Sequence, residues 1–103
     1  MTILVNLHHE KCQVPIDRTT PFGNPFHIGI DGTREEVVLK YKDHFYKMLK
    51  NDEFRDKVLA LKNEVLGCWC VPDLCHGHVI LEYLEGTPLP IKHVKETTIE
   101  DFI

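Results

Sequence analysis

Two short apolar runs constrain the fold most strongly, because a long helical segment separates them. Residues 2–7 (TILVNL) and 65–70 (VLGCWC) are rich in β-branched and apolar side chains, which is typical of buried strands. Strands joined through helices can lie parallel and adjacent, with their functional loops at the carboxyl ends. We therefore expect an α/β fold, a single small domain in which a short mixed or parallel sheet is flanked by about three helices.

Capping residues indicate where the helices begin and end. Thr33 followed by Glu36 forms the capping-box pattern and predicts a helix start, and the apolar residues that follow recur at spacings of three and four. Asp52 can cap a second helix. A last helix is predicted to begin near Cys75 and to end at Gly86.

Proline and glycine mark the irregular parts of the chain. Residues 13–16 (QVPI) predict a second short strand, and Pro15 confines it to an edge or a bulge because it has no amide proton. Gly67 predicts a close approach of another backbone. Residues 17–32 form a structured loop in which we expect positive φ at one or more of Gly23, Gly29 and Gly32.

Length and charge limit the classes of protein. With 103 residues the chain can build one core, so we expect a domain over residues 1–86 and an extended C-terminal arm over 87–103 that could support a homodimer. The net charge of −4 argues against broad electrostatic capture of nucleic acid, but not against recognition of one nucleotide. The first apolar run is too short to span a bilayer or to act as a secretion signal. We expect a cytoplasmic protein with reduced thiols and no membrane partner.

One stretch concentrates the chemistry. Residues 67–78 (GCWCVPDLCHGH) hold three of the four cysteines and two of the seven histidines. Short tracts of this kind often bind zinc, although the spacing C-x-C-x4-C-H-x-H is not the paired C-x2-C of zinc ribbons. The predicted ligands are Cys70, Cys75 and His76 with Cys68 as the fourth, or with His8, His9, Cys12 or His78 as substitutes.

Two other interpretations of the same stretch remain open. Cysteine is among the most buried residue types, so the cluster could be structural packing. Alternatively, Cys75 near a helix N-terminus could have a depressed pKa and act as a nucleophile, assisted by His76. The same amides could hold a phosphate or carboxylate of a substrate, with Arg18 or Arg34 as the countercharge.

The motifs resemble those of a known family. The segments GNPF (23–26), IGIDGTREEVVLKY (28–41) and LGCWCVPDLCHGHVI (66–80) are similar to a small family of phages and bacteria described only as a domain of unknown function. The resemblance covers residues 2–85. Members often carry an acidic residue where His78 stands, which favours His76 as the functional histidine, and Cys12 lies outside the motif. The signature falls on Gly23, Asn24, Pro25, Phe26, Thr33, Glu35, Cys68, Trp69, Cys70, Pro72, Cys75, His76 and Gly77.

The resemblance also implies a function. Members look like accessory proteins linked to guanine-derived bases in phage DNA, including transfer of small carbon groups to 7-deazaguanines. The expected activity is a methyl or other one-carbon transferase acting on a nucleotide or a modified base in DNA. S-adenosylmethionine would need an unfamiliar pocket, because no G-x-G-x-G motif follows the first strand.

The predicted roles within one pocket follow from the residue types. Asn24 and the backbone near Gly23 would read the edge of the base, Trp69 or Phe26 would stack on it, and catalysis would involve Cys75, His76 and Asn24. The competing hypothesis is a non-enzymatic binding or adaptor module, for example one that counters host defence, in which the metal only staples the fold.

Overall fold

Three parallel strands form the sheet, and its strand order is β1-β3-β2. The computed structural model describes residues 1–71 and 73–90. β3 pairs with β1 from Ile3 opposite Val65 onward, and with the short β2 on its other side. In chain order the elements are β1 (Ile3–Asn6), β2 (Val14–Pro15), α1 (Arg34–Met48), α2 (Asp52–Leu59), β3 (Val65–Cys68) and α3 (His76–Glu85).

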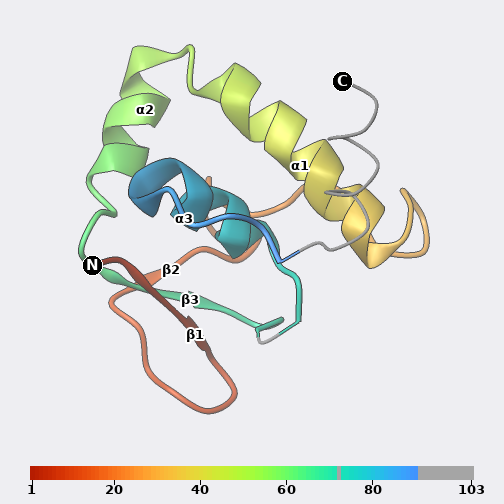
Figure 1. Ribbon diagram of the computed structural model, residues 1–103, viewed down its shortest axis with the longest axis horizontal. Coiled ribbons are helices and arrows are strands. Elements are labelled where there is room, and N and C mark those ends of the chain that lie inside the picture. Colours follow the sequence, from red (N-terminus) through yellow and green to blue (C-terminus); the bar gives the residue numbers. More distant parts are fainter. Residues whose placement is uncertain (72, 91–103) are drawn as a thin grey trace.

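The predicted α/β class is confirmed, and its sheet is entirely parallel. Both apolar runs of the sequence became neighbouring strands, and β2 lies at an edge, where Pro15 needs no donor partner on one side. The three helices lie on one side of the sheet, with α3 between the sheet and α1 (Figure 1). The carboxyl ends of the three strands therefore lie along one edge, beneath the start of α1 and α3.

The helix boundaries follow local capping chemistry. Thr33 and Glu36 form the predicted capping box at the start of α1. The N-cap of α2 is Asn51 and not Asp52, because the Asn51 side chain accepts the hydrogen bond from the backbone amide of Phe54. At the end of α3, Gly86 has φ of 73°, the left-handed cap expected of glycine.

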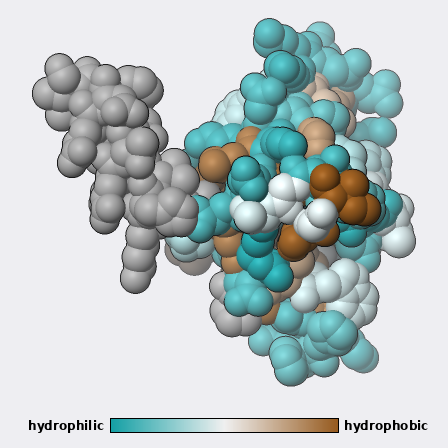
Figure 2. All heavy atoms as spheres, turned by 90° about the vertical axis from the view of Figure 1, so that its right-hand side faces the viewer, coloured by the Kyte–Doolittle hydropathy of each residue, from teal (hydrophilic) through white to brown (hydrophobic). Residues whose placement is uncertain are grey.

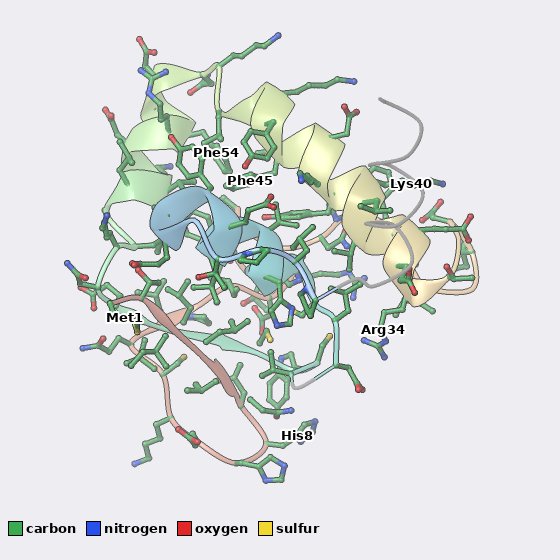
Figure 3. All side chains as sticks on the ribbon, viewed as in Figure 1. Met1, His8, Arg34, Lys40, Phe45 and Phe54 are labelled. Atoms are coloured by element: carbon green, nitrogen blue, oxygen red, sulfur yellow. The ribbon has the colours of Figure 1, made fainter. Side chains whose placement is uncertain are left out.

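Aromatic side chains fill the space between the helices. The rings of Phe45 and Phe54 lie 6.0 Å apart, and both project from their helices towards α3 (Figure 3). Tyr41 is buried too, and its hydroxyl donates to the Phe22 carbonyl at 2.8 Å. The largest fully buried side chains are Tyr41, Phe45, Ile16, Leu66, Ile80, Val58, Val79, Cys68 and Cys75.

The prediction for Gly67 is wrong, and the prediction of positive φ in the front loop is confirmed. A Cβ at Gly67 would lie 2.6 Å from both the Cys12 sulfur and Leu7 Cδ2, so side chains approach it rather than another backbone. In the front loop the positive φ values occur at Gly29 and Gly32, whereas Gly23 has none. Gly23 is required by space instead, since a Cβ there would lie 2.6 Å from the Cα of Arg18.

The C-terminal arm is only partly described. Residues 87–90 follow Gly86 without regular structure, and residues 91–103 lie outside the described part of the chain. The domain boundary at residue 86 and the arm therefore stay predictions. Over residues 1–71 and 73–90, none of the helices has the length and apolar character needed to cross a bilayer.

Candidate functional site

A cavity of about 120 Å³ lies at the carboxyl edge of the sheet. The segment after β2, the GNPF loop, the start of α1 and the segment after β3 all contribute to its wall. The two motif loops thus face one hollow, as the sequence predicted. The lining residues are Asp17, Arg18, Asn24, Phe26, Ile28, Arg34, Val37, Val38, Cys68, Trp69, Cys70, Leu74, Cys75 and His76.

Three cysteines line this cavity, and two of their sulfurs are in contact. The Cys75 thiol donates to the Cys68 sulfur at 3.2 Å, and both side chains are 1% exposed. Cys70 is half-buried at the cavity wall. Figure 3 shows sulfur atoms between the sheet and the first turn of α3. All four cysteines are free thiols.

The cluster has one principal proton donor, Cys75. Its hydrogen bonds to Cys68 and Cys70, together with burial, raise the pKa of the Cys75 thiol well above its usual range. The prediction that the helix N-terminus would depress the pKa of Cys75 is therefore wrong. Although the Gly77 amide does donate to its sulfur at 3.4 Å, this bond is outweighed by the neighbouring sulfurs and by burial.

Cys70 is the thiolate that a solute can reach. The hydrogen bond from Cys75, supported by a hydrogen bond from Arg34 and its positive charge, lowers the pKa of Cys70 to about 6 against the effect of burial. The same donor lowers the pKa of Cys68 to about 7, with burial and the charge of Cys70 acting in the other direction. Because a thiol has one proton to donate and Cys68 is sealed in the core, the accessible anion is Cys70.

His76 is a buried neutral histidine that ties α3 to the end of β2. Burial lowers the pKa of His76, although its bond to the Ile16 carbonyl acts in the opposite direction. Its Nε2 lies 2.6 Å from that carbonyl oxygen, which can only accept, so Nε2 carries the proton. Nδ1 then presents a lone pair to the Cys75 sulfur at 3.5 Å. His76 supplies no positive charge to the thiols, contrary to the suggested assistance.

His78 and His8 serve other contacts. His78 Nδ1 accepts the Cys75 backbone amide at 2.9 Å and so completes the capping box of α3. The His8 ring lies at the end of β1, with its centroid 4.7 Å from that of Trp69 (Figure 3). A cap and an aromatic contact thus account for the two rings, and their use as substitute metal ligands stays a prediction.

The predicted zinc ligands lie close to one another. Cys68, Cys75 and His76 are linked by sulfur–sulfur and sulfur–nitrogen contacts of 3.2 and 3.5 Å, and Cys70 lines the same wall. However, in the part of the chain that the structure describes, no group of three or more His, Cys, Asp or Glu side chains is arranged to hold a metal. Zinc therefore stays a prediction.

The GNPF loop uses its polar groups to hold itself together. Asn24 is buried, its Nδ2 donates to the Val37 carbonyl at 3.2 Å, and its Oδ1 accepts the Phe26 amide at 2.9 Å. Arg18 donates to the carbonyls of Asn24 and Phe26 at 2.9 and 3.0 Å. The side chain of Asn24 therefore stabilises the loop, and its role in recognising a base stays a prediction.

Arg34 connects α1 to the sulfur-rich loop. Its Nη1 donates to the Leu74 carbonyl at 3.2 Å, and its Nη2 lies 4.0 Å from Asp73. Figure 3 shows the side chain extending from the first turn of α1 towards the segment after β3. Arg18 also lines the cavity, so two guanidinium groups face it together with the carboxylate of Asp17.

Trp69 and Ile28 form the apolar rim of the cavity. Trp69 is 50% exposed and Ile28 is 52% exposed. The view onto the start of α1 and the loop before it shows hydrophobic surface among polar side chains (Figure 2). The exposure of Trp69 is compatible with the predicted stacking role, which stays a prediction.

Asp17 is a site residue that sequence reasoning missed. It lines the cavity, and its Oδ2 accepts the Trp69 indole nitrogen at 3.0 Å. Hydrogen bonds from Thr19 and Trp69 lower the pKa of Asp17, so it stays anionic. The D-x-T pattern at the end of a predicted strand is a turn signal that could have marked it, whereas its tryptophan partner depends on tertiary structure.

Known proteins are similar to this chain over most of its length. The model of a domain of unknown function, DUF4326, matches residues 5–86. The chain belongs to this family. It is also similar to the "uncharacterized 12.4 kDa protein in nrdA-td intergenic region" of Enterobacteria phage T4, with 35% identity over 79 residues that cover 75% of this chain and 71% of that protein. No solved structure matches the chain. The expected family type, with a phage relative, is thus confirmed.

Proposed function

We propose that this chain is a phage-type enzyme that modifies a guanine-derived base or nucleotide, with Cys70 as its nucleophile. The observation that carries the proposal is that an accessible thiolate shares one cavity with two arginines and an exposed tryptophan. A flat base can stack on an indole, and guanidinium groups bind phosphate or carboxylate. The net charge of −4 fits recognition of one nucleotide better than sliding on duplex DNA.

The other residues of the site would support Cys70. Cys75 donates to the anionic sulfur, Arg34 adds a positive charge beside it, and His76 holds the first turn of α3 in place through Ile16. Thiolates are stronger nucleophiles than thiols, so these contacts would keep Cys70 reactive at neutral pH. Cys75 and His76, expected to be catalytic, become positioning residues in this account.

The finer identity of the substrate rests on the family resemblance. We propose a 7-deazaguanine as the base, free or within DNA, and a one-carbon unit as the transferred group. S-adenosylmethionine is the proposed donor, and a cytoplasmic location would give access to it. The guanidinium groups of Arg18 and Arg34 in the cavity lining are compatible with a nucleotide phosphate or with the carboxylate of this donor.

Protection from alkylation tests the proposal whichever group is transferred. Cys70 should react with iodoacetamide at pH 7, and 7-deaza-2′-deoxyguanosine monophosphate at about ten times its Kd should slow that reaction about tenfold by occupying the cavity. Cys12, which does not line the cavity, is the internal control. Alkylation of Cys70 at the same rate with and without the nucleotide would contradict the proposal.

A specific observation favours a second candidate, the metal-stapled binding module. A histidine whose Nε2 is fixed by a carbonyl while Nδ1 faces sulfur is typical of a metal ligand held by its outer shell. Elemental analysis of protein purified without added metal decides between the two. The metal-stapled module is favoured if the protein holds one zinc per chain, if Cys75→Ser unfolds, and if the nucleotide leaves the rate of Cys70 alkylation unchanged. A zinc content near zero would exclude the metal-stapled module.

A further inference from the structure

We propose that the three clustered thiols are a peroxide-reactive site whose end product is a buried disulfide between Cys68 and Cys75. The proposal concerns oxidation of the site and does not require that a nucleotide is the substrate. It rests on the placement of the three sulfurs, one at the cavity wall and two in contact behind it.

All three cysteines line the cavity, and Cys70 is the most exposed of them. Cys70 is half-buried and lines the wall, whereas Cys68 and Cys75 are each 1% exposed. A hydroperoxide is small enough to enter and is attacked by an accessible thiolate. In this first step the Cys70 sulfur bonds to one peroxide oxygen, the O–O bond breaks, and a sulfenic acid and hydroxide are formed.

Cys75 is placed to resolve the sulfenic acid. It lines the same cavity as Cys70 and stands five positions further along the connection between β3 and α3, so that a bond between them closes no strained small ring. Attack of the Cys75 sulfur on the Cys70 sulfur forms a disulfide and expels the hydroxyl as water, with the thiol proton. Cys68 is separated from Cys70 by one residue, a poor arrangement for a disulfide.

The oxidation then passes inward to the sealed pair. The Cys68 sulfur lies 3.2 Å from the Cys75 sulfur, so a short rotation brings it to bonding distance. Its attack on Cys75 forms the Cys68–Cys75 disulfide and releases Cys70 as a thiolate. The net reaction converts two thiols and one hydroperoxide into one disulfide and two molecules of water when the oxidant is hydrogen peroxide.

The buried disulfide has a consequence for Cys70. Once Cys75 is part of a disulfide it has no proton to donate, so the accessible thiolate loses its main stabilising contact. The oxidised chain should still carry a free Cys70, but that residue should react with iodoacetamide more slowly at pH 6 to 7 than in the reduced chain.

Peptide mapping after hydrogen peroxide treatment tests the proposal on the full chain. The protein is oxidised, free thiols are blocked with iodoacetamide in denaturant, and the chain is cut before Asp73 and after Trp69. These cuts place Cys68, Cys70 and Cys75 on three separate peptides. The expected result is a mass loss of about 2 Da, a link between the peptides of Cys68 and Cys75, and a blocked Cys70.

Variants of the half-buried cysteine keep the test decisive. In Cys70→Ser, peroxide should no longer form the buried disulfide on the time scale seen in the parent chain. In Cys68→Ser, oxidation should stop at a Cys70–Cys75 disulfide. Cys12→Ser is the matched control and should oxidise as the parent chain does. Urea unfolding verifies that each variant is folded. A Cys68–Cys70 link, a persistent Cys70–Cys75 link in the parent chain, or unchanged oxidation of Cys70→Ser would overturn the proposal.

Discussion

The two loops that line the cavity use their polar groups differently. In and beside the GNPF loop, the side chains of Asn24 and Arg18 form hydrogen bonds with nearby backbone carbonyls and amides. In the sulfur-rich loop, Cys70 is left half-buried with its donors arranged around it. The first loop thus builds the wall and the second carries the reactive group, so substitutions in the two loops should affect different measurements.

The largest effect on stability is expected at Gly23 in the wall. In Gly23→Ala the new Cβ would lie 2.6 Å from the Arg18 Cα and the Asp17 carbonyl oxygen, and backbone atoms cannot move aside cheaply. The free energy of unfolding should fall by about 3 kcal/mol in urea denaturation. Gly29→Ala is the matched control, since nothing lies within 4 Å there and only its φ of 89° is strained. Equal losses at both glycines would contradict the packing argument.

Asn24→Ala should have the next largest effect. It removes the acceptor of the Phe26 amide and the donor to the buried Val37 carbonyl, and should lower the free energy of unfolding by about 2 kcal/mol. Asn24→Asp keeps the acceptor but sets a buried carboxylate oxygen against the Val37 carbonyl oxygen, so its loss near neutral pH should be at least as large. If Asn24→Ala instead left stability unchanged and abolished nucleotide protection of Cys70, Asn24 would be a reading residue and not a brace.

The pH dependence of stability tests the buried histidines behind the wall. Burial lowers the pKa of His76 and of His78 below the usual 6.5. Above pH 6.5 the two histidines are neutral in the folded chain and in the unfolded chain. Below pH 6.5 they bind protons in the unfolded chain but remain neutral in the folded chain, so the free energy of unfolding falls as the pH falls. Urea unfolding should show a loss of up to about 1.4 kcal/mol per pH unit for each histidine. His76→Gln should reduce this slope. An unchanged slope would show that His76 does not cause the pH dependence of stability.

Arg34→Met should have a small effect on stability and a distinct effect on reactivity. The guanidinium is partly exposed, so its loss should cost less than about 1 kcal/mol. Because Arg34 helps to lower the pKa of Cys70, the midpoint of Cys70 alkylation should move to higher pH. Lys42→Met, on the same helix and away from the cavity, is the control. An unchanged midpoint in Arg34→Met would show that this arginine does not lower the pKa of Cys70.

Features set by neighbouring residues were predictable from the sequence. The capping box of Thr33 and Glu36 and the final turn at Gly86 need only contacts a few residues apart, so their patterns specify them. The cap of the second helix was predicted one residue late, at Asp52, because Asn and Asp are equally good N-caps and the pattern offers both side by side. The parallel sheet followed from two apolar runs separated by helices, which leave few other topologies.

The site was predictable in place but not in detail. That two loops would share a cavity followed from the carboxyl ends of parallel strands. The ionisation of Cys75 did not, because the helix N-terminus is a local signal, whereas the sulfurs of Cys68 and Cys70 reach it through tertiary structure. The same holds for Asn24, whose partner Val37 lies on α1, and for the contact between Asp17 and Trp69.

The pH profile of Cys70 alkylation tests most directly the claim that this sulfur is the accessible thiolate of the cavity. Iodoacetamide labelling of the native chain, followed by peptide mapping, gives the rate at each cysteine from pH 4.5 to 9. Since only the thiolate reacts, the rate at Cys70 should rise through a midpoint of about 6 and should vanish in Cys70→Ser. A midpoint at Cys70 of about 8.5, the value of a free cysteine, or labelling of Cys70 only after unfolding, would contradict the account.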